Sequence, residues 1–480
     1  MQQLTGLDAA FLAMETPAVY GHVGSVCILD ASTAKVPVTL EVLTRLLEDR
    51  VHLVPMFRRR LAQVPLGLDQ PYWIEDPDFD IEFHVREIAL PAPGDDKQLA
   101  DQAARLHSRP LDRNRPLWEL YLISGLSGGR VAVYSKVHHA AIDGVGGNDI
   151  LAALLDLSPE GRDLAPAPPW TCDRVPGTVG LLTRSALSFS GHPVRAVRLT
   201  AELARSAPSL VQTVNLPRIP VLNRFLRRGS SAVFAQTGLR APKTPFNKPI
   251  TPHRRWAFCT VSLTDVKKVK NATGSTVNDV VMALCAGALR RWLLDHDALP
   301  DTPLIAAVPV SLRSEDQKGS GGNRVSTMIA PIPTDTSDPG ERLSLTHEAM
   351  RAAKEQHGAL PADLLSDAAQ FAMPALAGQA ARLNARLRLL EWLNPFNLFI
   401  SNVPGPNITL YYAGAELLGY YPLSAIAHGQ GLNMTVMSYR DGLHFGLIAC
   451  RELVPDLDDL ASHLVAELEE LLELADPAVG

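Results

Sequence analysis

The sequence predicts an α/β protein built from two domains of similar size. Strand patterns and amphipathic helix patterns alternate in both halves of the 480-residue chain, as in sheets that are covered by helices. A single domain usually holds roughly 100 to 200 residues, so this length favours two cores. A Pro-rich and helical stretch separates the halves. We therefore place a first domain at residues 1–165, a linker at 166–243 and a second domain at 244–480.

The composition is that of an ordinary globular protein. Apolar residues make up 46% and charged residues 20% of the chain, and the net charge is -6, so neither disorder nor nucleic-acid binding is indicated. The five cysteines show no CxxC spacing, which favours a reducing compartment over a disulfide framework or a zinc site. Neither a secretory leader nor an uncharged stretch of about 20 apolar residues is evident. We expect a cytoplasmic protein that is soluble or peripheral to a membrane.

The elements of the first domain follow from the spacing of apolar residues. Apolar runs bounded by turn signals predict strands at 22–30, 72–75, 80–86, 118–123 and 130–138. Helical spacing predicts a turn at 8–12 and helices at 39–53, 97–107 and 148–157. A Gly-rich turn joins the last two strands, so we expect them to form a hairpin.

The second domain contains two strong local signals. Thr276 stands three residues before Asp279 at the start of an apolar run, which predicts a capped helix. An Asp441-Gly442 turn between two apolar runs predicts a hairpin. Weaker patterns predict strands at 254–262 and 304–310, a basic helical linker at 178–214, a helical segment at 362–393 and a closing helix from 457. We expect the glutamates of the closing helix, Glu467 among them, to be solvated.

A pair of histidines at the end of the strand 130–138 is the best candidate for catalysis. Side chains alternate across a strand, so His139 should share a face with Val137, whereas His138 should face the other way. A neutral imidazole, with an ordinary pKa of about 6.5, is well suited to accept a proton from a hydroxyl. Asp143 can fix the loop that follows, and Gly144 lets its backbone turn tightly.

Two other enzyme classes fit the same region less well. A metal hydrolase built on His138, His139 and Asp143 is disfavoured, because adjacent strand residues point to opposite faces and cannot easily bind one ion. The run Gly125-Leu-Ser127-Gly-Gly129 matches the G-x-S-x-G pattern of serine hydrolases. That pattern requires a helix directly after the serine, and here a second strand is predicted. The run is better explained as the hairpin turn.

Several motifs in order resemble bacterial wax ester synthase/diacylglycerol acyltransferases, which have a chloramphenicol acetyltransferase-like fold. They are the His-His-x-x-x-Asp-Gly pattern at His138 to Gly144, Leu4-Thr-Gly-Leu-Asp8-x-x-Phe11-x-x-x-Glu15, Pro116-Leu-Trp118, Thr276-Val-Asn278-Asp279 and Ser401-Asn402-Val-Pro-Gly-Pro406. The resemblance covers nearly the whole chain. It implies two chloramphenicol acetyltransferase-like domains, each a mixed sheet with helices, that meet around the His139 loop and enclose a substrate tunnel.

The resemblance also implies a reaction. His139 would accept the proton of a diacylglycerol or fatty alcohol hydroxyl as that oxygen attacks the thioester of a long-chain acyl-CoA. No covalent acyl-enzyme and no cofactor would be needed, since acyl-CoA is a co-substrate. By the same resemblance, Asp143 would pair with an arginine and orient the loop. His138 and Gly144 would help to hold the loop and the substrate.

Residues of the second domain are candidates for the rest of the site. The tetrahedral oxyanion requires preorganised donors, and Asn278 is suited to this role because it lies in the first turn of a helix. The same residue could instead be a capping or loop-bracing amide. Ser401 and Asn402 could position substrate, although a Pro-Gly-Pro turn is also ordinary loop chemistry.

Three further questions stay open in the sequence. The basic segments 178–214 and 362–393 are consistent with a place at the inner face of a membrane or on lipid droplets, but a basic linker more commonly covers a cleft between domains. A relative of the same fold that acylates another alcohol or an amine is one alternative function, and a catalytically weak lipid-binding protein is another. Acyl chain length, preferred acceptor and oligomeric state are not encoded in any recognisable pattern.

Overall fold

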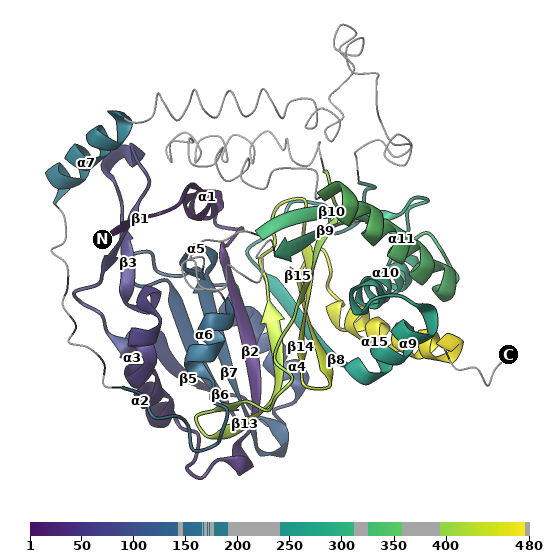
Figure 1. The fold of residues 1–480 in the computed structure, drawn as a ribbon, viewed down its shortest axis with the longest axis horizontal. Coiled ribbons are helices and arrows are strands. Elements are labelled where there is room, and N and C mark those ends of the chain that lie inside the picture. The colour runs from purple at the N-terminus through teal and green to yellow at the C-terminus, as the bar shows by residue number, and fades with distance from the viewer. Residues whose placement is uncertain are drawn as a thin grey trace, which may run out of the picture.

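Two six-stranded mixed sheets lie side by side and form the body of the protein (Figure 1). This computed structural model describes residues 1–142, 147–165, 167, 170, 172, 177–190, 241–311, 325–357 and 394–475. Helices cover the outer side of the second sheet and surround the first. The arrangement confirms the predicted α/β class with two sheet-containing domains.

The first sheet is built mainly from the N-terminal half. Its strands run in the order β12 (Tyr411–Tyr412), β13 (Ala415–Leu423), β2 (His22–Asp30), β7 (Arg130–His138), β6 (Trp118–Ser124) and β5 (Val85–Ala89). The neighbours β5 and β6 are parallel, and the other pairs are antiparallel. A smaller sheet contains β1 (Gln2–Gln3), β4 (Tyr72–Glu75) and β3 (Arg59–Ala62).

Helices and short 3-10 turns connect these strands. The helices are α1 (Gly6–Met14), α2 (Leu40–Arg50), α3 (Ile81–His84), α4 (Asp96–His107), α5 (His139–Ile142), α6 (Gly147–Leu154) and α7 (Thr178–Ser190). The 3-10 turns are η1 (Ala31–Thr33), η2 (Val51–Leu53), η3 (Pro55–Arg58), η4 (Pro65–Gly67) and η5 (Ser127–Gly129).

The second sheet belongs to the C-terminal half. Its order is β10 (Val325–Ile332), β9 (Leu304–Ser311), β11 (Leu398–Val403), β14 (Leu432–Tyr439), β15 (Gly442–Cys450) and β8 (Arg254–Ser262). Four helices gather on its outer side in Figure 1: α9 (Leu263–Thr273), α10 (Val277–Asp295), α11 (Pro339–His357) and α15 (Leu457–Ala475). Helix α10 is buried along most of its length and forms the centre of this core.

The two halves are joined by a strand that crosses between them. Strand β13 comes from the C-terminal half but pairs with β2 along the edge of the first sheet. It also touches the second sheet, since the Trp256 indole donates to the Pro422 carbonyl at 3.2 Å. A Cβ on Gly446 of β15 would lie 1.8 Å from that carbonyl oxygen. Only glycine therefore allows the two sheets to approach at this point.

Most of the predicted elements are confirmed. Thr276 caps α10 and forms a capping box with Asp279, and Asp441 lies in the turn of the β14–β15 hairpin as expected. The strand after η5 confirms that the Gly-rich run at 125–129 is a turn and not a nucleophile elbow. The expected helical segment at 362–393 and most of the linker helix beyond residue 190 lie outside the described residues.

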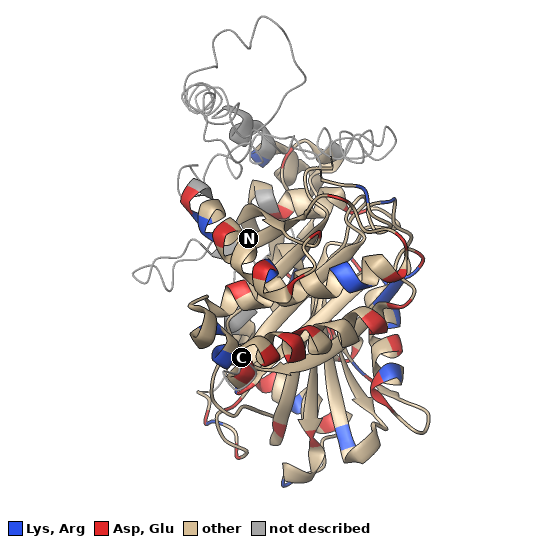
Figure 2. Cartoon of the chain, turned by 90° about the vertical axis from the view of Figure 1, so that its right-hand side faces the viewer, with Lys and Arg blue, Asp and Glu red and all other residues tan. Residues whose placement is uncertain are grey.

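Two predictions away from the histidines were wrong. The expected strand at 80–86 is helix α3 followed by β5, because the Asp80 side chain accepts the Glu82 N–H and starts a helical turn. Acidic residues do run along α15 (Figure 2), but Glu467 is not solvated. It is only 2% exposed and pairs with Arg291 and Arg342. Charge pattern alone did not reveal these two arginines on other helices.

Among the described helices, none is individually long and apolar enough to cross a membrane. The helices α9 and α10 meet that criterion only when taken together, and the chain bends by 103° between them.

Candidate active site

The two histidines lie where β7 gives way to a helix. Strand β7 ends at His138, and α5 begins at His139. The His138 N–H still donates to Leu117 at 2.9 Å, and the His139 N–H donates to Gly21 at 2.8 Å. The expectation that His139 would continue the strand was therefore wrong by one residue. Its side chain is placed by the start of α5 and not by strand alternation.

His138 is buried and holds this turn. Its Nδ1 accepts the Ala140 N–H at 3.1 Å, and its Nε2 lies 3.2 Å from Glu15 Oε1. An Nδ1 that accepts a hydrogen bond carries no proton, so these contacts assign the neutral tautomer with the proton on Nε2, which donates to Glu15. His138 thus ties the first residues of α5 to the N-terminal segment.

Glu15 is the other half of this contact. Its carboxylate accepts the Gly21 N–H at 2.8 Å and two bonds from Arg113 at 3.1 and 2.5 Å. Burial raises the pKa of a carboxyl, but the contacts with His138, Gly21 and Arg113 outweigh it and lower the pKa of Glu15 to about 2. Gly21 is required here, because a Cβ would lie 2.7 Å from His138 Nε2.

His139 stands beside this network against an aromatic ring. Its imidazole stacks on Phe11 of α1 with 4.2 Å between ring centroids and 21° between ring planes. Burial, and to a smaller extent the adjacent His138, lower the pKa of His139 to about 4, although the Asp8 carboxylate acts in the opposite direction. The imidazole is therefore neutral at pH 7 and able to accept a proton.

The roles of Phe11 and Glu15 were not predicted. Both belong to a motif that sequence analysis used only as a family resemblance. The signal was present in its spacing, since Asp8, Phe11 and Glu15 are three and four residues apart and thus lie along one side of a helix. Nothing in the sequence indicates that this side faces residues more than 100 positions away.

The opposite side of β7 carries a buried charged pair. Lys136 is fully buried, and its ammonium contacts Glu119 at 2.9 Å and the carbonyls of Leu106 and Arg109 at 3.2 and 3.1 Å. Burial lowers the pKa of Lys136, and Glu119 partly offsets this effect. Each ammonium hydrogen thus has an acceptor. The pair fixes β7 to the end of α4, close to the histidine turn.

Two of the predicted residues of the second half, Asn278 and Asn402, contact each other. Asn402 on β11 donates through Nδ2 to Asn278 Oδ1 at 3.2 Å. Asn278 does not cap its helix, because Thr276 and Asp279 already form the capping box. Ser401 pairs with Thr435 in the β11–β14 ladder. The remaining predicted residues, Asp143 and Gly144, lie outside the described part of the chain.

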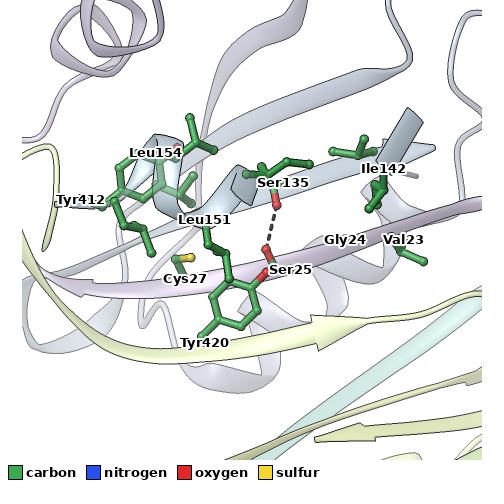
Figure 3. Close-up of a pocket in the computed structure, with 14 residues that line it drawn as sticks. Val23, Gly24, Ser25, Cys27, Ser135, Ile142, Leu151, Leu154, Tyr412 and Tyr420 are labelled. Atoms are coloured by element: carbon green, nitrogen blue, oxygen red, sulfur yellow. Dashed lines mark hydrogen bonds between the residues drawn. The ribbon is translucent and has the colours of Figure 1, made fainter. Parts of the chain in front are cut away.

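A mostly apolar cavity of about 160 Å³ lies close to the histidine turn. Its wall is formed by β2, β7 and α6, together with Ile142 at the end of α5 and tyrosines from the β12–β13 edge (Figure 3). Val137, two residues before His139, also lines it. The first half therefore combines a neutral imidazole with an adjoining space for an apolar group.

Comparison with family models decides what kind of protein has this arrangement. Residues 4–281 match the wax ester synthase/diacylglycerol acyltransferase catalytic domain, and residues 321–472 match the C-terminal domain of the same family. The chain belongs to the wax ester synthase/diacylglycerol acyltransferase family. The resemblance drawn from its motifs is thereby confirmed.

Individual relatives agree with this assignment. A putative diacylglycerol O-acyltransferase of Mycobacterium tuberculosis is 39% identical over 99% of this chain and 91% of its own length. A probable diacylglycerol O-acyltransferase of the same species is 38% identical over 98% of both chains. The solved wax ester synthase/diacylglycerol acyltransferase from Marinobacter aquaeolei VT8 matches with a TM-score of 0.68 and 31% identity, and the match covers 99% of this chain and all of that one.

More distant structures share only the fold. The first condensation domain of the calcium-dependent antibiotic synthetase matches with a TM-score of 0.54 and 16% identity, over 99% of this chain and 97% of that chain. This match supports the two-domain chloramphenicol acetyltransferase-like architecture and gives no information on substrates.

Proposed function

We propose that this family member is an acyl-CoA-dependent O-acyltransferase that esterifies a lipid alcohol. The acceptor is diacylglycerol, which gives triacylglycerol, with fatty alcohol as a second acceptor that gives wax ester. The main support for this proposal is a neutral His139 just after β7, in a chain whose relatives are described as diacylglycerol O-acyltransferases. Acyl-CoA serves as co-substrate, and the reaction uses no cofactor.

In the proposed reaction His139 acts as general base. The imidazole accepts the hydroxyl proton as the acceptor oxygen attacks the thioester carbonyl, and no acyl group is transferred to the protein. The C–O bond forms, the C–S bond of the tetrahedral intermediate breaks, and His139 returns the proton to the leaving thiolate of coenzyme A. Phe11 and the His138–Glu15 contact keep the imidazole in place while this happens. Asp143, which we expect to pair with an arginine, would orient the same loop.

Asn278 is our candidate for a donor to the oxyanion. Its Oδ1 accepts the hydrogen bond from Asn402. The NH2 group of Asn278 takes no part in that bond and remains able to donate. Its position in the first turn of α10 adds the favourable end of the helix dipole. Asn402 and Ser401, which lie on β11, then serve substrate binding. Gly144 does so at the histidine turn, whose backbone His138 holds in place.

We propose that the protein works at the inner face of a membrane or on lipid droplets, because its substrates and product are insoluble in water. The basic segments 178–214 and 362–393 support this location. Flotation with anionic vesicles tests it. Binding should weaken at high salt, and failure to bind vesicles or emulsified triacylglycerol would contradict the proposal.

Release of coenzyme A tests the reaction directly. Purified protein is incubated with hexadecanoyl-CoA alone and with a panel containing diacylglycerol, fatty alcohols, other alcohols and amines. Release should rise well above the background only with lipid alcohols, and the ester should appear in equal amount. Preference for an amine or a different alcohol would assign another acceptor. If no acceptor increases release, the lipid-binding alternative replaces the enzymatic one.

A further inference from the structure

The cavity beside the histidine turn is the feature that the reaction above leaves unexplained. It occupies the space between helix α6 and the face of β2 and β7 that carries Ser25 and Ser135 (Figure 3). Helix α6 contributes Ile150, Leu151 and Leu154. Its wall is thus made mainly of aliphatic side chains from β2, β7, α5 and α6.

The polar groups of the wall are largely satisfied without a ligand. Ser25 Oγ and Ser135 Oγ lie 2.7 Å apart and hydrogen-bond to each other across β2 and β7. A cavity whose polar groups already have partners gives water little to bind and favours hydrocarbon. The Tyr412 hydroxyl, by contrast, is buried without a hydrogen-bond partner among the described residues.

The cavity extends along β7 toward the turn that holds His139. Val133, Ser135 and Val137 line it in succession, and four residues of strand span about 13 Å. Ile142 lines it as well and ends the short helix that His139 begins. In Figure 3 Ile142 lies at one end of the group and Tyr412 lies at the other. A ligand that enters beside His139 would therefore run along the strand, away from the reacting atoms.

The volume indicates what kind of ligand fits. An engineered cavity of about 150 Å³ with a similar lining stays dry and binds benzene, so this one holds about six carbon atoms. A diacylglycerol carries two chains side by side, whereas the acyl group of a thioester carries one.

We propose that the cavity receives the methyl end of the acyl chain of acyl-CoA and thereby sets the preferred chain length. This inference rests on the proposed function, because it takes acyl-CoA as the donor. The thioester lies at His139, and the last few carbons of the chain lie between α6 and the sheet.

Leu151→Phe tests the proposal by filling the cavity from α6. The ligands are S-hexadecyl-CoA and S-octyl-CoA, thioethers that cannot transfer an acyl group, and affinity is measured by calorimetry. The wild-type protein should bind the hexadecyl compound more tightly. In the variant, the ratio of the hexadecyl affinity to the octyl affinity should fall about fourfold for each methylene group that no longer fits in the cavity. Ala152→Phe is the matched control, since Ala152 is exposed on the same helix and should leave both affinities unchanged.

A second variant guards against misfolding. Leu151→Ala enlarges the cavity and should shift the preference toward chains longer than hexadecyl, while circular dichroism confirms a native fold. Unchanged chain-length preference in both folded variants would overturn the proposal. So would a change in acceptor preference with no change in donor preference, which would place the acceptor chain in the cavity.

Tyr412→Phe should retain affinity for S-hexadecyl-CoA. A loss of that affinity would indicate a polar ligand instead.

These measurements separate the inference from the proposed function. Binding of a thioether does not require turnover, so chain-length selection that depends on residue 151 would stand even if no acceptor released coenzyme A. Conversely, an active enzyme whose chain-length profile ignores Leu151 would keep the proposed function and refute the cavity assignment.

Discussion

His138 and His139 are adjacent in sequence but have different surroundings. His138 is 1% exposed and uses both ring nitrogens to join Ala140 to Glu15. His139 instead stacks on Phe11 and is held neutral by its buried position. The two neighbouring imidazoles are therefore held differently, His138 by hydrogen bonds within the turn and His139 by stacking on an aromatic ring.

This difference predicts unequal effects of two substitutions. His139→Ala should lower kcat by about 100-fold to 10,000-fold, the usual contribution of a general base, and leave the melting temperature nearly unchanged. His138→Ala should cost less activity per folded molecule but destabilise the protein by about 1 to 3 kcal/mol, because Glu15 and the Ala140 N–H lose a buried partner. Turnover is compared at equal folded fraction after thermal denaturation curves are recorded. A larger loss of turnover in His138→Ala would show that the base is misassigned.

The pH dependence of the reaction provides an independent check on His139. With its pKa lowered from 6.5 to about 4, kcat/KM should stay level below pH 6 and fall only near pH 4. Asp8 raises this pKa, so Asp8→Asn should move the acidic limb to lower pH. An acidic limb near 6.5 in the wild-type protein would contradict the assignment.

The same pKa has a consequence for stability. The unfolded chain binds the proton of His139 more tightly than the folded protein does, so protonation favours unfolding. This residue should therefore reduce folding stability as the pH falls from about 6.5 toward 4. In His139→Ala this part of the pH dependence should be absent from denaturation curves.

At the scale of elements, α15 shows how helices of the second half are locked together. Glu467 accepts from Arg291 of α10 and Arg342 of α11. It can approach because α10 has Gly287 at this point, where a Cβ would lie 1.8 Å from Glu467 Oε2. Three helices therefore share one buried carboxylate.

Removing that carboxylate should be strongly destabilising. Glu467→Ala leaves the buried Arg342 guanidinium unpaired, and the loss of one partner of a buried ion pair costs about 3 to 5 kcal/mol. Glu473→Ala on the exposed side of the same helix should change stability by no more than about 0.5 kcal/mol. Chemical denaturation of both variants measures the difference. Equal stabilities would show that the Glu467 pairs contribute nothing.

At the scale of the whole molecule, the halves are not separate units. Strand β13 completes the edge of the first sheet with residues from the far end of the chain, and one core cluster contains residues of both halves, such as Tyr134 and Trp256. The histidine turn at the end of β7 is therefore supported by a sheet that neither half can complete alone.

This topology predicts the behaviour of fragments. Residues 1–240 produced alone should not fold, because β2 loses its pairing with β13 and presents an open edge. Co-expression with residues 241–480 should restore soluble protein with a cooperative melting transition. A fragment 1–240 that is soluble and melts cooperatively by itself would contradict this prediction.

The sequence by itself determined the local elements and the family. The capping box at Thr276, the Asp441-Gly442 hairpin and the strand that leads into His138 depend on residues only a few positions apart, so their spacing was enough to predict them. The motifs around the histidines were likewise enough to identify the family, which the comparisons confirm.

The tertiary structure alone decided which residues surround those elements. The contact between Glu15 and His138 spans 123 positions, the pairing of β13 with β2 spans nearly the whole chain, and the burial of Glu467 depends on arginines from two other helices. Hydrophobic periodicity reports which side of an element is buried but not which partner buries it. For this reason the histidine turn could be found in the sequence, whereas its supporting contacts and the adjoining cavity could not.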